Sequence, residues 1–196
     1  AAEMFRTYGI RAVTMDMLAS QMGISKRTIY EVFSDKDELL AGVLKSMAYK
    51  QKELIDRVLG ESANVIEALF KLLDLTMEHF SKMSPAFKLD IKKYHQSMAD
   101  SLEQSDSLPY VKNNEMIIER GIREGNFRKD IDVKIINRCM FEVARMTNDR
   151  ELFPPDDFSS AEIVRNVYIN YLRGLCTTEG LDLIDHYEKK RKQKNI

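Results

Sequence analysis

The chain has little of the residue types that build disulfide-stapled or loop-rich proteins. Its 196 residues include two cysteines, four prolines, eight glycines and no tryptophan. Cys139 and Cys176 lie far apart and form neither a C-x-x-C pair nor a secretory disulfide framework. Because proline and glycine interrupt helices, their scarcity favours an all-α fold. We interpret both cysteines as small, buried, apolar side chains on helix faces.

Long apolar runs and an excess of one charge are also missing. No apolar run approaches the roughly 20 residues that a membrane span needs, and nothing resembles a signal peptide. The 30 basic and 31 acidic residues give a net charge of -1. This balance disfavours nonspecific nucleic-acid binding by the protein as a whole. We therefore expect a cytoplasmic protein with no membrane partner.

Patterns typical of catalysis or metal binding are not found in the sequence. His79, His95 and His186 are isolated from one another, and none belongs to an i, i+4 metal-binding pair. There is no glycine-rich phosphate loop and no nucleophile elbow. The sequence therefore predicts no enzymatic activity, no catalytic residue, no cofactor and no metal site.

Residues 14–40 predict two short helices around a glycine turn, followed at once by a third helix. Thr14 is suited to cap a helix that runs to about Met22, because its hydroxyl can accept from free N–H groups of the first turn. Gly23 can adopt the positive φ of a tight turn. Ser25 is then suited to cap a helix from Lys26 to about Val32. This is the layout of a helix-turn-helix that reads DNA.

Helical spacing predicts which side chains of this segment face inward. The inward set is Met17, Leu18, Gln21, Met22, Ile24, Ile29 and Phe33. Tyr30 lies between core and surface. The outward set is Lys26, Arg27, Thr28 and Glu31. A face so rich in hydrogen-bond donors is what a groove-reading helix needs.

The N-terminal part of the sequence resembles the TetR-type family of bacterial transcriptional repressors. The resemblance covers about the first quarter of the chain and is carried by Phe5, Gly9, Thr14, Leu18-Ala19, Gly23-Ile24-Ser25, Thr28-Ile29-Tyr30, Phe33, Lys36 and Leu39-Leu40. It implies a three-helix DNA-binding domain over 1–46, with the motif at about 14–33. It also implies a larger helical domain over 47–196 that binds an effector and dimerises. Ala1 resembles the middle of the family's first helix, so we expect further residues before it, which in the family often carry basic contacts to DNA.

The predicted DNA-contacting residues are Thr14, Ser25, Lys26, Arg27, Thr28, Tyr30 and Lys36. Arg27 is the best candidate for guanine, because a guanidinium can bond O6 and N7 together. Tyr30 and Lys36 are expected to contact phosphates. Acidic residues nearly cancel the basic ones between residues 1 and 50. We therefore expect the affinity to depend on a dimer that engages two half-sites.

The rest of the chain keeps a helical period with few breakers. Asp37 is in position for a capping box that begins a long helix at Ser34 or Asp35. A second capping box is predicted at Ser159 and Glu162. The expected helices span about 34–59, 63–82, 86–105, 109–124, 131–149, 159–176 and 180–192.

The resemblance implies that the helices at about 131–149 and 159–176 form a homodimer. Both carry more apolar surface than one face requires, which suggests a second burial partner. The candidate interface residues are Ile136, Met140, Val143, Val164, Val167, Tyr168, Tyr171 and Leu175. A two-fold dimer would present two reading helices about 34–36 Å apart and prefer a near-palindromic operator.

The resemblance also implies a small-molecule effector cavity among the helices between about 63 and 124. Methionine adapts to apolar ligands of different shapes, and a few polar tips can orient them. The candidate lining residues are Phe80, Phe87, Ile91, Tyr94, His95, Met98, Tyr110, Met116 and Ile117. The same aromatic and methionine spacing is also typical of ordinary core.

The sequence predicts a ligand-responsive transcriptional repressor. One alternative is a helical small-molecule carrier or enzyme whose helix-turn-helix no longer binds DNA, which the weak positive charge of that region would favour. Another is a module that acts mainly through protein contacts. Salt-dependent binding to a palindrome separates the repressor from both.

Overall fold

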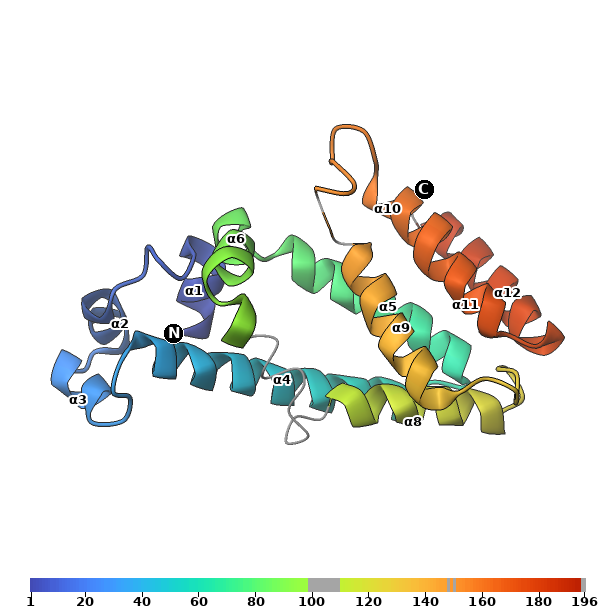
Figure 1. The fold of residues 1–196 in the computed structure, drawn as a ribbon, viewed down its shortest axis with the longest axis horizontal. Coiled ribbons are helices and arrows are strands. Elements are labelled where there is room, and N and C mark those ends of the chain that lie inside the picture. Colours follow the sequence, from blue (N-terminus) through green and yellow to red (C-terminus); the bar gives the residue numbers. More distant parts are fainter. Residues whose placement is uncertain (99–109, 148, 150, 195–196) are drawn as a thin grey trace. The chain divides into compact units, whose positions relative to one another are not determined.

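The computed structural model describes residues 1–98, 110–147, 149 and 151–194, and its regular structure is helical (Figure 1). The described ranges contain no strand, although Phe127 and Cys176 form an isolated antiparallel bridge. The predicted all-α fold is confirmed. The helices are α1 (Ala2–Tyr8), α2 (Met15–Met22), α3 (Lys26–Tyr30), α4 (Lys36–Glu61), α5 (Val65–Ser81), α6 (Pro85–Tyr94), α8 (Tyr110–Arg123), α9 (Val133–Met146), α10 (Ser160–Ile163), η1 (Val164–Ile169), α11 (Asn170–Leu175) and α12 (Thr178–Lys194).

Two of the expected helices differ from those observed. The helix expected over 86–105 is interrupted after Tyr94, because His95 leaves helical geometry with φ −130° and ψ 18°. No proline or glycine between 86 and 98 marks this interruption, and residues 99–105 lie outside the described ranges. The helix expected over 159–176 contains the π-helical segment η1, whose wider turns do not follow the α-helical period.

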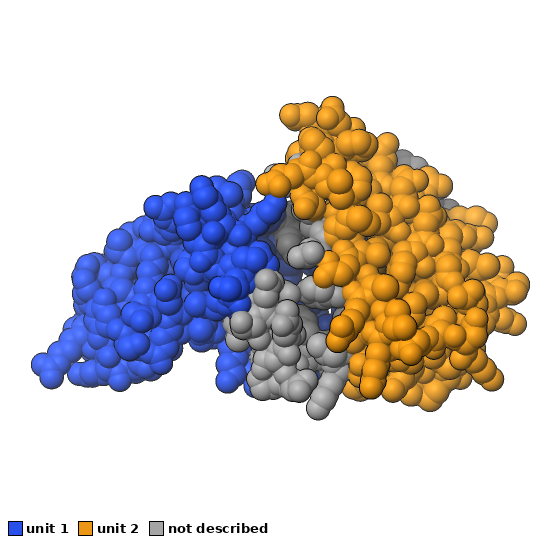
Figure 2. All heavy atoms as spheres, viewed as in Figure 1, with its two compact units in different colours: residues 1–57, 72–111 blue, residues 58–71, 112–196 orange. Residues whose placement is uncertain are grey.

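The chain divides into two compact units (Figure 2). Unit 1 comprises residues 1–57 and 72–111, and unit 2 comprises residues 58–71 and 112–196. Helices α4 and α5 each contribute residues to both units. These units are defined by packing contacts. The expected division at 46/47 separates a DNA-binding domain from an effector-binding domain, and it stays a prediction.

Unit 1 has a hydrophobic core shared by its first helices and α6. Phe5, Leu18 and Leu40 are fully buried there. Phe87 of α6 belongs to the same cluster, so α6 packs against the N-terminal helices. The buried members are Phe5, Ile10, Val13, Met15, Leu18, Ala19, Ile29, Leu39, Leu40, Val43 and Phe87.

Unit 2 buries apolar side chains from α5, α8, α9, α12 and the three segments α10, η1 and α11. Among the most deeply buried are Val65, Ile66, Ile118, Phe127, Leu172 and Ile184. Cys176 is buried, as expected, but Cys139 is exposed. The prediction for Cys139 was wrong because its position on α9 faces away from the core that buries Met140. In the described ranges, no helix combines the length and apolar character that a bilayer crossing requires.

Candidate nucleic-acid interface

Two hydroxyl side chains cap the helices of the predicted helix-turn-helix. Thr14 Oγ1 accepts from the Met17 N–H at 3.2 Å, and Ser25 Oγ accepts from the Thr28 N–H at 3.1 Å. Between the two helices, Gly23 adopts φ 65° and ψ 29°, which is the left-handed conformation that glycine takes without strain. These three predictions are confirmed. The cap and turn residues therefore fix α3 against α2.

Helix α3 has one buried position and an exposed outer face. Ile29 is only 3% exposed and anchors the helix in the core of unit 1. Phe33, just beyond the helix, packs against the same core. The predicted DNA-contacting residues Lys26, Arg27, Thr28 and Tyr30 are all exposed. The sequence-based assignment of these faces is confirmed.

The predicted inward face of α2 is confirmed at Leu18 and was wrong at the other positions. Met17, Met22 and Ile24 are 41%, 45% and 41% exposed, and Gln21 is also exposed. Leu18 is buried together with Met15 and Ala19, and the i, i+3, i+4 spacing of these three residues defines a face rotated from the expected one. Ile24 lies in the turn after α2, where its N–H donates to the Ala19 carbonyl at 3.0 Å.

Both basic side chains of α3 are bonded to carboxylates. Lys26 Nζ lies 2.8 Å from Asp16 Oδ2, and Arg27 Nε lies 3.3 Å from Glu31 Oε1. The hydrogen bond and charge of Asp16 raise the pKa of Lys26 above its ordinary value. Lys26 is therefore a cation at any physiological pH. The spacing of Arg27 and Glu31 could have indicated their i, i+4 pair from sequence, whereas Asp16 lies ten residues from Lys26 on another helix.

Lys36 begins α4 beside the same motif. Its partial burial lowers the pKa of the ammonium group, while the charges of Asp90 and Asp37 oppose that shift. The capping residue of α4 is Asp35, whose Oδ1 accepts from the Glu38 N–H at 2.8 Å. Glu38 in turn accepts from the Ser34 N–H at 2.6 Å. The predicted role of Asp37 was wrong because the helix begins one residue later than a Ser34 cap requires.

Helix α6 supports the helix-turn-helix from the side of α1. Asp90 Oδ2 accepts from the Arg11 backbone N–H at 2.9 Å, and Arg11 Nη1 donates to the Tyr94 hydroxyl at 3.0 Å. Gly9 allows the close approach, since a Cβ there would lie 2.9 Å from the Ala86 Cβ. This contact could not be predicted from the sequence, because its partners lie about 80 residues apart.

The candidate effector residues lie in different parts of the structure. Phe87, Ile91 and Met98 pack in or against the core of unit 1. Tyr94 bonds Arg11, and His95 Nδ1 lies 3.8 Å from Asp37 Oδ1, also within unit 1. Ile117 is buried in unit 2, where Met116 is 52% exposed. The side chains of Phe80 and Tyr110 lie outside the described residues. In the described part of the chain, no cluster of histidine, cysteine and carboxylate side chains is placed to hold a metal ion.

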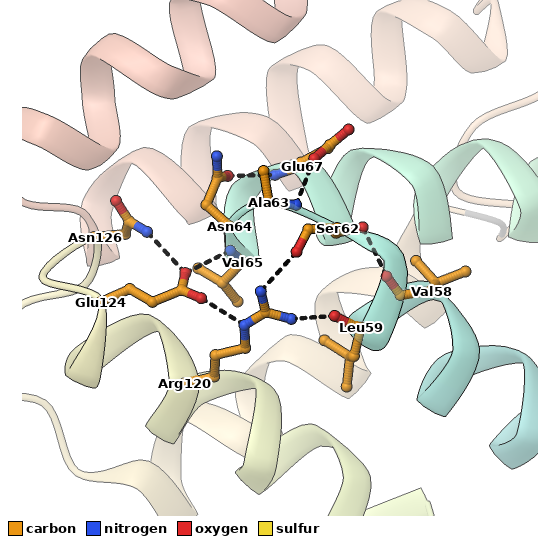
Figure 3. Close-up of polar contacts among 10 residues, drawn as sticks. All are labelled: Val58, Leu59, Ser62, Ala63, Asn64, Val65, Glu67, Arg120, Glu124 and Asn126. Atoms are coloured by element: carbon orange, nitrogen blue, oxygen red, sulfur yellow. Dashed lines mark hydrogen bonds and ion pairs between the residues drawn. The ribbon is translucent and has the colours of Figure 1, made fainter.

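Unit 2 contains a polar cluster that joins the α4–α5 connection to the end of α8 (Figure 3). The Arg120 guanidinium donates to the Leu59 carbonyl, and to the Ser62 carbonyl at 2.8 Å. Its Nε also pairs with Glu124 at 2.5 Å. Glu124 then accepts from the Val65 N–H, at the first residue of α5, at 2.6 Å. One side chain thus satisfies two carbonyls where α4 ends, and its partner caps α5.

The candidate dimer residues divide between buried and partly exposed positions. Met140, Val164, Tyr168 and Leu175 are at most 9% exposed within the single chain and belong to the core of unit 2. The half-buried candidates are Ile136, Val143, Val167 and Tyr171. The predicted capping box is confirmed, since Ser159 and Glu162 bond each other's backbone N–H groups. A partner would meet mainly the half-buried set.

Known proteins resemble this chain in sequence and in fold. The family described as "Bacterial regulatory proteins, tetR family" matches residues 1–43. The uncharacterized HTH-type transcriptional regulator YhgD of Bacillus subtilis is 31% identical over 180 residues, which cover 86% of this chain and 90% of that protein. The HTH-type transcriptional repressor KstR2 of Mycobacterium tuberculosis is 25% identical over 92% of this chain and 91% of its own.

A solved transcriptional regulator from Cytophaga hutchinsonii has the same fold. Its TM-score is 0.68 at 21% identity, over 90% of this chain and 94% of that one. The matched segment at 1–43 contains the capped helices, the Gly23 turn and the exposed face of α3. The chain belongs to the tetR family of bacterial regulatory proteins and is a helix-turn-helix transcriptional regulator.

Proposed function

We propose that this regulator represses transcription by binding a near-palindromic operator as a homodimer, and that a small-molecule effector releases it. The observation that carries the proposal is the exposed, donor-rich face of α3, held by the Ser25 cap and the Ile29 anchor. The relative KstR2 is named as a repressor. In the cell, the regulator would meet its operator in the cytoplasm, without catalysing a reaction.

The predicted DNA contacts can be assigned roles from their exposure and chemistry. Arg27, whose side chain is 89% exposed, is assigned to a guanine through two parallel hydrogen bonds. Lys26 and Thr28 are assigned to base edges or backbone, and Tyr30 and Lys36 to phosphates. Thr14 and Ser25 start the two helices and would lie near the DNA backbone. The DNA-binding domain is proposed to span 1–46.

Dimerisation is proposed through α9 and the α10, η1 and α11 segments of the effector-binding domain, 47–196. The half-buried residues on these segments supply the surface, and exposed Ile135 lies beside them on α9 at 60% exposure. Two chains related by a two-fold axis would place their α3 helices about one DNA turn apart. The two half-sites together would supply affinity that one weakly basic domain lacks.

The effector is proposed to act through the helices that join the DNA-binding helices to the rest of the chain. Helix α4 leads directly from the helix-turn-helix, and α6 contacts it through the Arg11 and Asp90 bond. A ligand that binds one arrangement of these helices better than another shifts the equilibrium between them. The coupling would then change the spacing of the two α3 helices and the operator affinity.

The proposal is tested by selecting from a pool of randomised duplex DNA at moderate salt and sequencing the retained molecules. The expected result is enrichment of a palindrome with half-sites about one turn apart. The control is the same selection with Arg27→Ala, which should weaken or alter the enriched motif. If nothing is enriched by the parent protein, the chain is better described as a helical carrier or enzyme.

A further inference from the structure

The recognition helix carries a carboxylate where DNA would dock. Glu31 follows α3 directly, and its side chain is 60% exposed. It lies one helical turn after Arg27, on the same face, and accepts from Arg27 Nε through Oε1 at 3.3 Å. This bond does not involve the terminal nitrogens of Arg27 or the second oxygen of Glu31. The terminal nitrogens of Arg27 and the second oxygen of Glu31 are therefore suited to contact DNA placed against this face.

A carboxylate on this face is unfavourable for DNA binding unless it finds a donor. Phosphates surround both grooves, and they repel a negative side chain. Between residues 14 and 36, the three basic side chains are matched by three acidic ones, so the segment has little excess charge to offset that repulsion. Base contacts must therefore supply much of the binding free energy.

The donors that bases present in the major groove are the amino groups of cytosine and adenine. The adenine N6 group lies beside N7, which is an acceptor and disfavours a neighbouring carboxylate. Cytosine presents its N4 group without such an acceptor on the same base. Cytosine is therefore the base that suits Glu31, as guanine suits Arg27.

We propose that Arg27 and Glu31 read the operator together. Arg27 bonds O6 and N7 of a guanine, while Glu31 accepts from the N4 amino group of a cytosine in the adjacent base pair. The Arg27–Glu31 bond holds the two side chains side by side for this purpose. This inference rests on the proposed function, because it requires sequence-specific binding by α3.

The test compares sequences selected by the parent protein, Glu31→Gln, Glu31→Ala and Arg27→Ala. The parent should select a cytosine at one position of each half-site. Glu31→Gln should shift that position toward adenine, because a carboxamide can bond N6 and N7 together. Glu31→Ala should lose about tenfold or more of the discrimination there. Glu53→Gln is the matched control. Glu53 is exposed on α4, so this substitution removes the same charge away from the outer face of α3.

Three results would overturn the inference, and they are distinguishable. If both Glu31 variants select the parent's sequence and only bind all DNA more tightly, as Glu53→Gln would, the carboxylate contributes charge alone. If they alter only the position that Arg27→Ala alters, Glu31 positions Arg27 and reads no base. If the parent selects no palindrome, the proposed function fails first, and this inference fails with it.

Discussion

The carboxylate of Asp90 in α6 accepts a hydrogen bond from the backbone N–H of Arg11, in the loop between α1 and α2, at 2.9 Å. Asp90 is only 8% exposed, and Arg11 also reaches the Tyr94 hydroxyl on the same helix. The guanidinium of Arg11 lies 4.7 Å from the centre of the Tyr94 ring. These contacts fix the loop that leads into the helix-turn-helix to α6. If a ligand moved α6, the loop would move with it.

Replacing Asp90 should therefore destabilise unit 1. Asp90→Ala leaves the Arg11 N–H without its partner, which should lower the free energy of unfolding by about 1–3 kcal/mol. Asp90→Asn keeps a carbonyl acceptor of similar size and should lose less. Urea unfolding of the two variants and the parent measures the difference. Equal losses for both variants would contradict a role for the hydrogen bond itself.

Arg120 should stabilise the end of α4 in unit 2. Arg120→Ala leaves the carbonyls of Leu59 and Ser62 without this donor, and an unsatisfied group typically costs about 1–3 kcal/mol. Hydrogen exchange should accelerate across residues 58–65. Arg123→Ala, at an exposed position on the same helix, is the control and should change neither quantity. Unchanged exchange in Arg120→Ala would show that the cluster does not hold this connection.

Arg27 and Lys36, the two cations proposed to contact a base and a phosphate, should differ in what their loss does to DNA binding. Arg27→Ala should relax the preference for one base, because a side chain assigned to a base edge is removed. Lys36→Ala should weaken binding to all sequences alike and reduce the salt slope by about 1, because a phosphate contact is lost. Affinities measured for the selected and scrambled duplexes over a salt series separate the two effects. A sequence-selective loss in Lys36→Ala would contradict its assignment to a phosphate.

The two cysteines should differ in reactivity. Burial raises the pKa of the Cys176 thiol from 9.0 to about 11, whereas Cys139 is exposed. Below pH 9, an alkylating reagent should modify Cys139 in the folded protein and reach Cys176 only in urea. Mass spectrometry of the alkylated protein gives the count. Modification of both residues in the folded protein would contradict the burial of Cys176.

The same shift predicts how stability depends on pH. The folded chain holds the Cys176 proton more tightly than the unfolded chain does, so this contribution to stability is fully present below about pH 9. It is lost as the pH rises through about 11. The stability of the parent relative to Cys176→Ala should therefore fall over this interval. A constant difference would contradict the raised pKa.

Several local features of this protein could be predicted from its sequence. The caps at Thr14, Ser25 and Ser159 and the left-handed turn at Gly23 depend on the chemistry of neighbouring residues, and all four are confirmed. Such features are visible because each requires particular residue types at fixed spacing.

Features set by tertiary packing could not be predicted in this way. Ile24 is apolar, yet it is 41% exposed in the turn between α2 and α3. Phe87 and Ile91 have the spacing of a helix face, but the pattern does not say that the N-terminal helices cover that face. The bond between Arg11 and Asp90 joins residues with no local signal. The exposed face of α3 could be predicted because its caps, turn and anchor are local.

The proposed function requires the exposed face of α3 to read a DNA sequence. The most direct measurement is the affinity of the parent protein for its selected palindrome and for a scrambled duplex of the same length and composition, at one salt concentration. Sequence reading by α3 should give a ratio of about 10³ or more in favour of the palindrome. Equal affinities for the two duplexes would contradict it.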